Sequence, residues 1–294
     1  MPELPDIVVY IESLEARILG HTLERVKILN PFVLRSVAPA LEEAQGKPVS
    51  SLHRLGKRIV IGVKPDYFFV IHLMVAGRFR WIEPNAKSPG KISLASFHFP
   101  NGVLLLTEAG TKRLASIHLV KGQDSLAQFD MHGLEVLEAG LAEFAARLTN
   151  ENHTLKRALT DPRSFSGIGN AYSDEILHRA KLSPIAQSQK LKQQEIERLF
   201  ESTKATLREW TERLRQNSRG KFPEKVTAFR AEMAVHGRFG LPCPVCASPV
   251  QRIVYAANET NYCARCQTGG VILADRALSR LLKKSWPRAL GDIE

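Results

Sequence analysis

The stretch that does most to set the fold of this chain is residues 243–266, CPVCASPVQRIVYAANETNYCARC. It holds all four cysteines of the sequence, in two C-x2-C pairs. Each pair delivers two thiolates from one tight turn, and the segment Val250–Tyr262 suits a β-hairpin that brings the two pairs together. Four converging thiolates predict one structural Zn²⁺ and leave no open position for zinc catalysis. The predicted ligands are Cys243, Cys246, Cys263 and Cys266.

The charge balance points to a polyanionic partner. The 294 residues include 41 Lys+Arg and 30 Asp+Glu, a formal net charge of +11. A basic surface of this kind binds nucleic acid by neutralising phosphates and releasing their counterions. No apolar run approaches the roughly 18 residues of a membrane helix, so we expect no membrane association. The opening MPELPDIVVY has no basic segment of a secretory signal, which predicts a reducing, cytoplasmic compartment.

Upstream of the cysteines the periodicity changes twice. Residues 5–19 carry apolar side chains at helical spacing, and residues 133–214 again read as helices. The region between them, residues 21–120, has short β-type runs broken by Pro, Gly and Asn, which favours an antiparallel sandwich or barrel. The expected strands are Lys57–Val63, Tyr67–Leu73, Arg78–Ile82, Ile92–Phe99 and Val103–Thr107, and the later helices are Leu134–Leu148, Thr154–Leu159, Asn170–Ala180 and Leu191–Leu214. The fold class is therefore α+β.

A glycine turn precedes one of these helices. Ser166-Gly-Ile-Gly169-Asn170 places two glycines just before the predicted helix start. Backbone N–H groups at a helix N-terminus bind phosphate, and glycine allows close approach. Asn170 adds a side-chain donor, and Lys156 lies on the preceding helix. The alternative is a plain turn; the helical context and the basic neighbour favour a clamp on a DNA backbone.

The start of the chain carries a possible nucleophile. Removal of Met1 before the small Pro2 would free a secondary amine with a pKa near 7.7–8.0, well below that of lysine. Such an amine can attack a sugar C1′ and leave a cationic iminium. Glu3 is placed to move protons, and Lys57 supplies a second cation. Taken alone, Pro2-Glu3 fits an ordinary helix start equally well.

The ordered set of motifs resembles the Fpg/Nei family of DNA glycosylases, the formamidopyrimidine-DNA glycosylase and endonuclease VIII group. The matches run in order over residues 2–267. They are Pro2-Glu3-Leu4-Pro5, Gly56-Lys57, His72-Leu73 with Gly77-Arg78, Leu155-Lys156, Gly167–Glu175, and Gly237-Arg238 followed by the four cysteines and Gln267.

This resemblance implies a domain order. It comprises an N-terminal catalytic β-sandwich with a first helix in residues 1–130 and a helix–two-turns–helix DNA-binding domain in 131–236. A zinc-finger β-hairpin in 237–268 and a basic tail in 269–294 follow. The loop at residues 216–227 falls where some members cover the flipped base.

The resemblance also implies an activity: a bifunctional DNA glycosylase and AP lyase of base excision repair, excising oxidised bases, with oxidised purines as the default substrate. Pro2 is then the Schiff-base nucleophile, Glu3 the proton donor and acceptor, and Lys57 a basic residue at the lesion. Lys156, Gly169 and Asn170 resemble phosphate binders. The implied partner is double-stranded DNA with an oxidised base or abasic site, bound by a monomer at the bacterial nucleoid.

Four positions depart from the family pattern. Asp6 stands where a glutamate is usual, so its reach toward the lesion is shorter. The intercalating methionine is replaced by Val75, with Met74 one place early. Arg113, with the leucine after it, stands in loosely for the residues that fill the void and read the orphaned base. Asn258 replaces a zinc-hairpin arginine, which removes a bidentate phosphate contact and bears on δ-elimination.

Two other functions stay open. The departures fit a degenerate member that binds damaged or abasic DNA with little or no catalysis. A zinc-ribbon transcription or scaffold protein would explain the cysteines and the charge, but it gives no reason for Pro2-Glu3 or for the glycine turn.

Overall fold

The computed structural model describes residues 1–84, 86, 90–110, 112–224, 226–227, 229–255, 258–274 and 287–292. The chain forms two compact units, one of Met1–Met131 with Trp210–Thr227 and the other of His132–Glu209 with Ala228–Glu294. No helix in the described ranges is long and apolar enough to cross a membrane. The four domain ranges expected from the sequence stay a prediction. The basic tail positions Arg276, Arg280, Lys283 and Lys284 lie outside the described residues.

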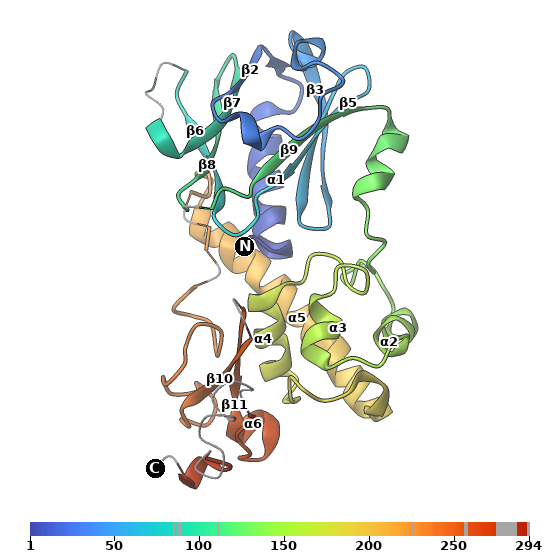
Figure 1. Ribbon diagram of the computed structural model, residues 1–294, viewed down its shortest axis with the longest axis vertical. Helices are drawn as coiled ribbons and strands as arrows, with labels where there is room; N and C mark the ends of the chain where they lie inside the picture. The colour runs from blue at the N-terminus through green and yellow to red at the C-terminus, as the bar shows by residue number, and fades with distance from the viewer. Residues whose placement is uncertain are drawn as a thin grey trace. The chain divides into compact units, whose positions relative to one another are not determined.

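The first unit contains two antiparallel sheets that enclose the larger hydrophobic core (Figure 1). Residues that pair across a sheet, such as Ile61, Phe69 and Leu119, point to the same face and are buried there. One sheet has the order β1 (Thr22–Leu23), β3 (Lys47–Leu55), β4 (Arg58–Val63), β5 (Tyr67–His72) and β9 (Ser116–Lys121). The other has the order β2 (Arg25–Ile28), β7 (Ser93–Phe99), β8 (Gly102–Glu108) and β6 (Gly77–Ile82). The expected β-sandwich is confirmed.

Helix α1 (Leu4–Ile18) packs its buried face against β3 and β4. Its start is stabilised by a capping contact in which the Glu3 amide N–H donates to Asp6 Oδ2 over 3.0 Å. An acid at the third helical position commonly closes the first turn in this way. Asp6 therefore caps the helix, and its shorter reach toward a lesion stays a prediction.

The segment after helix α5 (Gln193–Ser218) joins the core of the first unit. Phe222 and Val226 are buried there, and the Phe222 ring lies 5.8 Å from that of Tyr10 and 6.5 Å from that of Trp81. Arg17 donates to the Gly220 carbonyl over 3.2 Å. A stretch that is polar and loop-like in sequence is thus anchored by one aromatic side chain.

The second unit is helical and ends in a hairpin, as expected. Figure 1 shows α4 beside α3 and beside the hairpin, in agreement with their contacts. The elements are α2 (Leu141–Thr149), α3 (Leu155–Thr160), α4 (Asn170–Arg179), α5 (Gln193–Ser218), β10 (Val250–Tyr255), β11 (Asn258–Cys263) and α6 (Ala264–Thr268). Helix α5 begins in the second unit and ends in the first.

The sequence-based helix Leu134–Leu148 is wrong in its first half. Helix α2 begins only at Leu141, after Gly140. Leu134 is extended instead, because its N–H donates to Ser164 and its carbonyl accepts from Ser166. These bonds to a distant segment outweigh the local apolar spacing. Strands β1, β2, β3 and β9 were also missed, since their alternation is short or interrupted.

Candidate functional site

The amino end of the chain lies in a cluster of charged side chains. Four of them act electrostatically on the terminal amine: Glu3, Arg78, Asp6 and Lys57. The pKa of that amine lies below its ordinary value, chiefly because of burial; Arg78 and Lys57 lower it further, and the two acids oppose them. Glu3 is buried beside it, at 2% exposure. The structure therefore brings Glu3 and Lys57 to the end of the chain where the sequence predicts a nucleophile.

Lys57 owes its position to a two-residue hairpin turn. Gly56 and Lys57 join β3 to β4, where Leu55 pairs with Arg58. Gly56 has φ +62°, the left-handed conformation that such turns require and that glycine adopts without strain. Arg54 donates to the Gly56 carbonyl over 2.8 Å and braces the turn. Lys57 is half-buried.

Val75 projects from the connection between β5 and β6. This connection is a turn, and Val75 is 61% exposed at its tip. The sequence left open whether Met74 would point away from Val75 in a strand. Met74 instead has φ +53°, within the turn, and is only partly exposed. Val75 is thus the more exposed apolar side chain.

Arg113 lies in a loop that a buried carboxylate organises. Glu108 is 2% exposed and accepts the backbone N–H groups of Leu114 and Ala115 over 2.9 and 3.1 Å. The Arg113 guanidinium donates to the Lys91 carbonyl over 2.6 Å, and Leu114 is 47% exposed. This places Arg113 and Leu114 on the surface of the first unit.

The glycine turn precedes α4 as the sequence predicts. Gly167 has φ +80°, and Gly169 is the residue before the helix. The Asn170 Nδ2 donates to the Glu259 carbonyl over 2.8 Å, which uses one of its two hydrogens within the second unit. Asn258 begins strand β11, next to Glu259. The second unit therefore brings Asn170 close to the hairpin tip that carries the departure at Asn258.

Lys156 is held differently from the sequence-based expectation. Its Nζ lies 2.7 Å from the Asn170 carbonyl, 2.8 Å from Ser173 Oγ and 2.5 Å from Asp174 Oδ1. An ammonium has three hydrogens, so these acceptors engage all of them. The Lys156 side chain is 14% exposed and that of Asp174 is fully buried. Lys156 thus holds the first turn of α4. Its phosphate contact stays a prediction.

A buried polar network extends from Asp174, and sequence reasoning missed it. Asp174 Oδ2 accepts from His236 Nδ1 over 2.8 Å and from the Asn261 N–H over 3.2 Å. Asn261 Oδ1 accepts the Gly237 N–H over 2.8 Å. These residues are far apart in sequence, so no local motif predicts the network. The one available signal was an acidic residue, Asp174, at a position that helical spacing places on the buried face of α4.

Glu175 fixes the segment that leads into the zinc finger. Its carboxylate accepts the backbone N–H groups of residues 234, 235 and 236 over 2.7, 2.9 and 3.0 Å. Burial raises the pKa of Glu175, and the three backbone donors oppose that effect. Neighbouring carboxylates on α4 thus secure the segment that leads into the finger and strand β11 within the finger.

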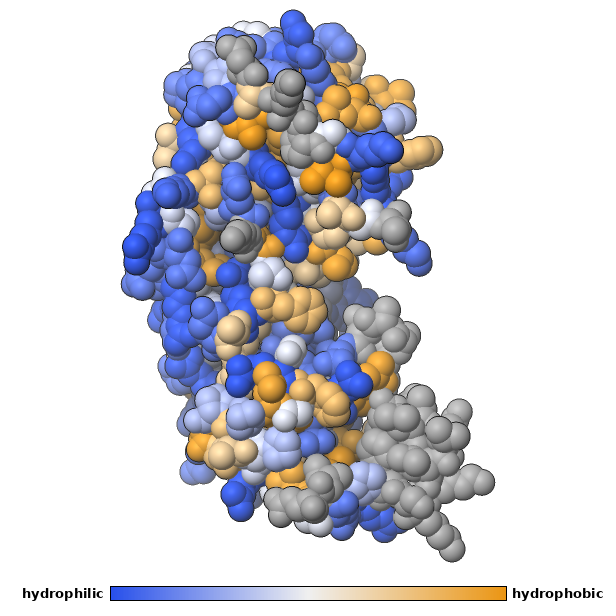
Figure 2. Space-filling view, turned by 90° about the vertical axis from the view of Figure 1, so that its left-hand side faces the viewer, coloured by the Kyte–Doolittle hydropathy of each residue, from blue (hydrophilic) through white to orange (hydrophobic). Residues whose placement is uncertain are grey.

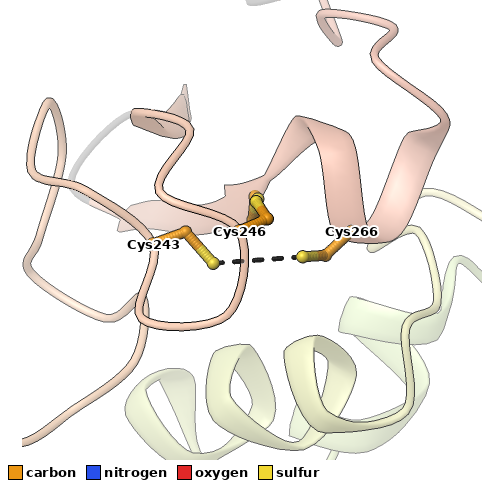
Figure 3. Close-up of side chains that lie close together, drawn as sticks. Cys243, Cys246 and Cys266 are labelled. Carbon is orange, nitrogen blue, oxygen red and sulfur yellow. Dashed lines mark hydrogen bonds between the residues drawn. The ribbon is translucent and has the colours of Figure 1, made fainter.

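The four cysteines form a metal site. Their sulfur atoms all lie within 4.8 Å of one another. Cys243 and Cys266 Sγ are 3.9 Å apart (Figure 3). Cys246 and Cys263 Sγ are 3.4 Å apart. A tetrahedron with Zn–S bonds of about 2.3 Å requires sulfur separations of about 3.8 Å. The residues therefore fit one Zn²⁺, and the predicted structural site is confirmed.

The surroundings of the thiols suit a bound cation. Burial raises the pKa of Cys266 to about 11 and raises that of Cys263 further. Such thiols become thiolates at neutral pH when a cation binds and protons leave. His178 Nε2 on α4 lies 3.3 Å from Cys243 Sγ, within hydrogen-bond reach. Helix α4 therefore contacts the finger at its ligand as well as at its hairpin.

The surface agrees with the charge balance. Hydrophilic residues cover much of the face drawn in Figure 2, and hydrophobic residues appear there in smaller groups. Over the whole chain Lys and Arg outnumber Asp and Glu by 41 to 30, a net charge of +11. Such a surface is compatible with a polyanionic partner.

Three family models match the chain in order. They are the formamidopyrimidine-DNA glycosylase N-terminal domain over residues 1–117, the H2TH domain of the same enzymes over 135–219, and the zinc finger found in FPG and IleRS over 240–269. The chain belongs to the formamidopyrimidine-DNA glycosylase family. Membership assigns it to the DNA glycosylases, which are enzymes of DNA repair.

Individual members of the family resemble the chain over most of its length. The formamidopyrimidine-DNA glycosylase of Thermus thermophilus is 32% identical over 281 residues, 92% of this chain and 100% of that protein. The crystal structure of a Thermus thermophilus enzyme of this family has a TM-score of 0.76 at 28% identity and covers 90% of this chain and 98% of that one. A complex of the Lactococcus lactis enzyme with DNA containing an abasic site shares the fold, with a TM-score of 0.80 at 23% identity, and covers 90% of this chain and 99% of that one.

Proposed function

We propose that this chain is a bifunctional DNA glycosylase and AP lyase of base excision repair, which removes an oxidised base and then cleaves the strand at the abasic site. The observation that carries the proposal is the cluster at the amino end, where Glu3, Lys57 and Arg78 act on one amine. Family membership supplies the glycosylase class, and the cluster supports the choice of nucleophile.

The nucleophile we propose is the Pro2 amine, freed by removal of Met1. Pro2 is buried while Met1 precedes it. The amine that the structure describes belongs to Met1, one residue earlier, and its pKa is already lowered by burial and by Arg78 and Lys57. A lowered pKa increases the unprotonated fraction at neutral pH, which is the fraction that can attack.

The chemistry then proceeds in balanced steps. Attack of the Pro2 nitrogen on C1′ forms the N–C1′ bond, and the base departs with the glycosidic electron pair and takes up a proton. The nitrogen then gives up its proton, which passes to O4′, while the nitrogen lone pair breaks the C1′–O4′ bond, opens the sugar and leaves an iminium. Loss of a C2′ proton then sends electrons toward the iminium and expels the 3′ phosphate. We assign Glu3 to these proton transfers, since it is buried beside the amine.

DNA binding is assigned to both units. In the first, the exposed Val75 would enter the base stack and Arg113 would meet the orphaned base. In the second, Gly169 and Asn170 would bind phosphate at the start of α4. At the finger tip, Asn258 would contact the backbone without the bidentate grip of an arginine.

We propose oxidised purines as the first substrates, in duplex DNA, with the protein acting as a monomer at the bacterial nucleoid. The relatives that match over the whole chain are named for formamidopyrimidine, a ring-opened purine. Base chemistry at C1′ requires the nucleotide to leave the stack, which a mismatched or damaged base does at lower cost.

Borohydride reduction on single-lesion duplexes tests the proposal. The processed protein should form a covalent adduct with abasic and oxidised-purine DNA, and Pro2→Gly or a retained Met1 should abolish it. Pro5→Gly is the matched control, because it removes a proline from the same helix start without touching the nucleophile. Adduct formation that persists in Pro2→Gly would refute the assignment of the amine.

The second candidate is a binder with little or no turnover. The replacement at Asn258 and the engagement of Lys156 within the protein favour it. Nicking of an abasic duplex at excess substrate separates the two. More than one cleavage per protein molecule would exclude the binder, whereas tight binding with no cleavage would exclude the enzyme.

A further inference from the structure

The backbone of Gly77 closes the turn between β5 and β6 against the Leu73 carbonyl. The Gly77 N–H donates to the Leu73 carbonyl over 2.9 Å. A Cβ added at Gly77 would lie 2.1 Å from that same carbonyl oxygen, so no other residue fits without moving the backbone. The turn between these two residues therefore projects Val75 outward, at 61% exposure.

Arg78 follows this turn directly and is bonded to it. Its Nη1 donates to the Val75 carbonyl over 3.0 Å and to the Gly77 carbonyl over 2.6 Å. Its own carbonyl accepts from Thr107 Oγ1 on β8 over 3.2 Å, and its backbone pairs with Thr107 in the sheet. One end of Arg78 is thus fixed in the sheet while the other fixes the turn.

The Arg78 charge also acts on the amine at the start of the chain. Among the side-chain charges that act on the terminal amine, that of Arg78 ranks after Glu3 and ahead of Asp6 and Lys57. These groups come from the start of α1, from the β3–β4 turn and from β6. The basic residue that the sequence singled out, Lys57, is therefore the weaker of the two cations here.

Taking the proposed function as given, we propose that Arg78 is a positioning residue that couples base extrusion to nucleophilic attack. Its guanidinium holds the turn that presents Val75, and its positive charge opposes protonation of the attacking amine. A guanidinium suits both tasks, because its planar set of donors can serve two carbonyls while the cation stays charged at every physiological pH.

The test uses the processed full-length protein and three variants. Arg78→Gln removes the charge, Arg78→Lys keeps the charge but loses the planar set of donors, and Arg80→Gln removes the same charge two residues further along β6. Two quantities are measured for each: the pH dependence of the borohydride-trapping rate on an abasic duplex, and the fluorescence rise of 2-aminopurine placed beside the lesion. Thermal unfolding shows whether each variant is folded.

Removing a positive charge beside an amine raises the pKa of that amine. We expect Arg78→Gln to move the trapping midpoint up by about 0.5–1 pH unit, which slows trapping about 3–10-fold below the midpoint. Arg78→Lys should keep the wild-type midpoint but slow the 2-aminopurine rise by about twofold or more, since the lysine side chain ends one bond short of the Nη1 position from which Arg78 bonds the Val75 and Gly77 carbonyls. Arg80→Gln should match the wild type in both.

The outcomes separate this inference from the proposed function. A wild-type protein that does not trap refutes the proposed function itself. A wild type that traps, with Arg78→Gln sharing its midpoint, overturns the electrostatic role of Arg78. Wild-type fluorescence kinetics in Arg78→Lys overturn its role in the turn. If Arg78→Gln does not fold, Arg80→Gln decides the electrostatic role. A rise of about 0.5–1 pH unit in the trapping midpoint of Arg80→Gln would show that the effect is not specific to Arg78 and would overturn that role.

Discussion

Replacing Lys156 by methionine removes an ammonium from a buried network while keeping the length of the side chain. Three acceptors lose their donor, among them Asp174, whose side chain is fully buried. Breaking a buried ion pair by removing one partner costs about 3–5 kcal/mol. Because His236 and the Asn261 N–H still bond the other carboxylate oxygen, we expect about 2–4 kcal/mol for Lys156→Met.

Two measurements distinguish this structural role from a phosphate contact. Calorimetry should show a lower unfolding temperature for the transition of the second unit in Lys156→Met. The slope of log K against log salt for duplex DNA should stay unchanged, whereas a lost phosphate contact would reduce its magnitude by about 0.9. The exposed Lys190→Met is the matched control and should change stability by no more than about 0.5 kcal/mol.

A double variant checks the cause of the loss. If the cost arises from stranding the Asp174 carboxylate, Lys156→Met with Asp174→Asn should be less destabilised than the sum of the two single variants. Stability within about 0.5 kcal/mol of the wild type in Lys156→Met, with a reduced salt slope, would refute the reasoning. In that case the ammonium would be a DNA contact, as the sequence alone predicts.

Three further predictions follow from contacts in the two units. Phe222→Ala should lower the free energy of unfolding of the first unit by about 2–4 kcal/mol, because a buried ring is lost beside Tyr10, and it should speed proteolysis at residues 219–224. An unchanged free energy of unfolding in denaturant, together with an unchanged cleavage rate, would contradict this prediction. The pKa of His72 is lowered to about 4, first by burial and then by Arg58 and Lys57, so its share of stability is complete above pH 6.5 and is lost as the pH falls toward 4. His72→Gln should therefore flatten the pH dependence of unfolding between these values by about 2–3 kcal/mol, and an unaltered curve would count against this. Metal analysis should find one zinc per chain and less in Cys246→Ser, with weaker DNA binding after chelation; a metal-free wild type that binds DNA normally would exclude a structural role.

The sequence alone determined those features that depend on neighbours in the chain. The spacing of Cys243 to Cys266 specified the metal site, since two tight turns deliver their ligands locally. The glycine turn and the start of α4 were likewise predicted, because Gly167 adopts a conformation that other residues disfavour. Helix α1, which has a strong local period, and the β10–β11 hairpin, which lies between the two cysteine pairs, were predicted to within one residue at each end.

The tertiary structure decided which polar groups meet. Asp174 accepts from residues 18, 62 and 87 positions away, and no local pattern encodes such pairs. Leu134 is not helical for the same reason. Its backbone N–H and carbonyl bond to Ser164 and Ser166, which the fold brings beside it, and these bonds satisfy the backbone groups that a helix would have paired. The amino end of the chain combines the two cases. The sequence predicted Lys57 as a cation near the amine, whereas the effect of the Arg78 charge on the same amine became visible only in the folded structure.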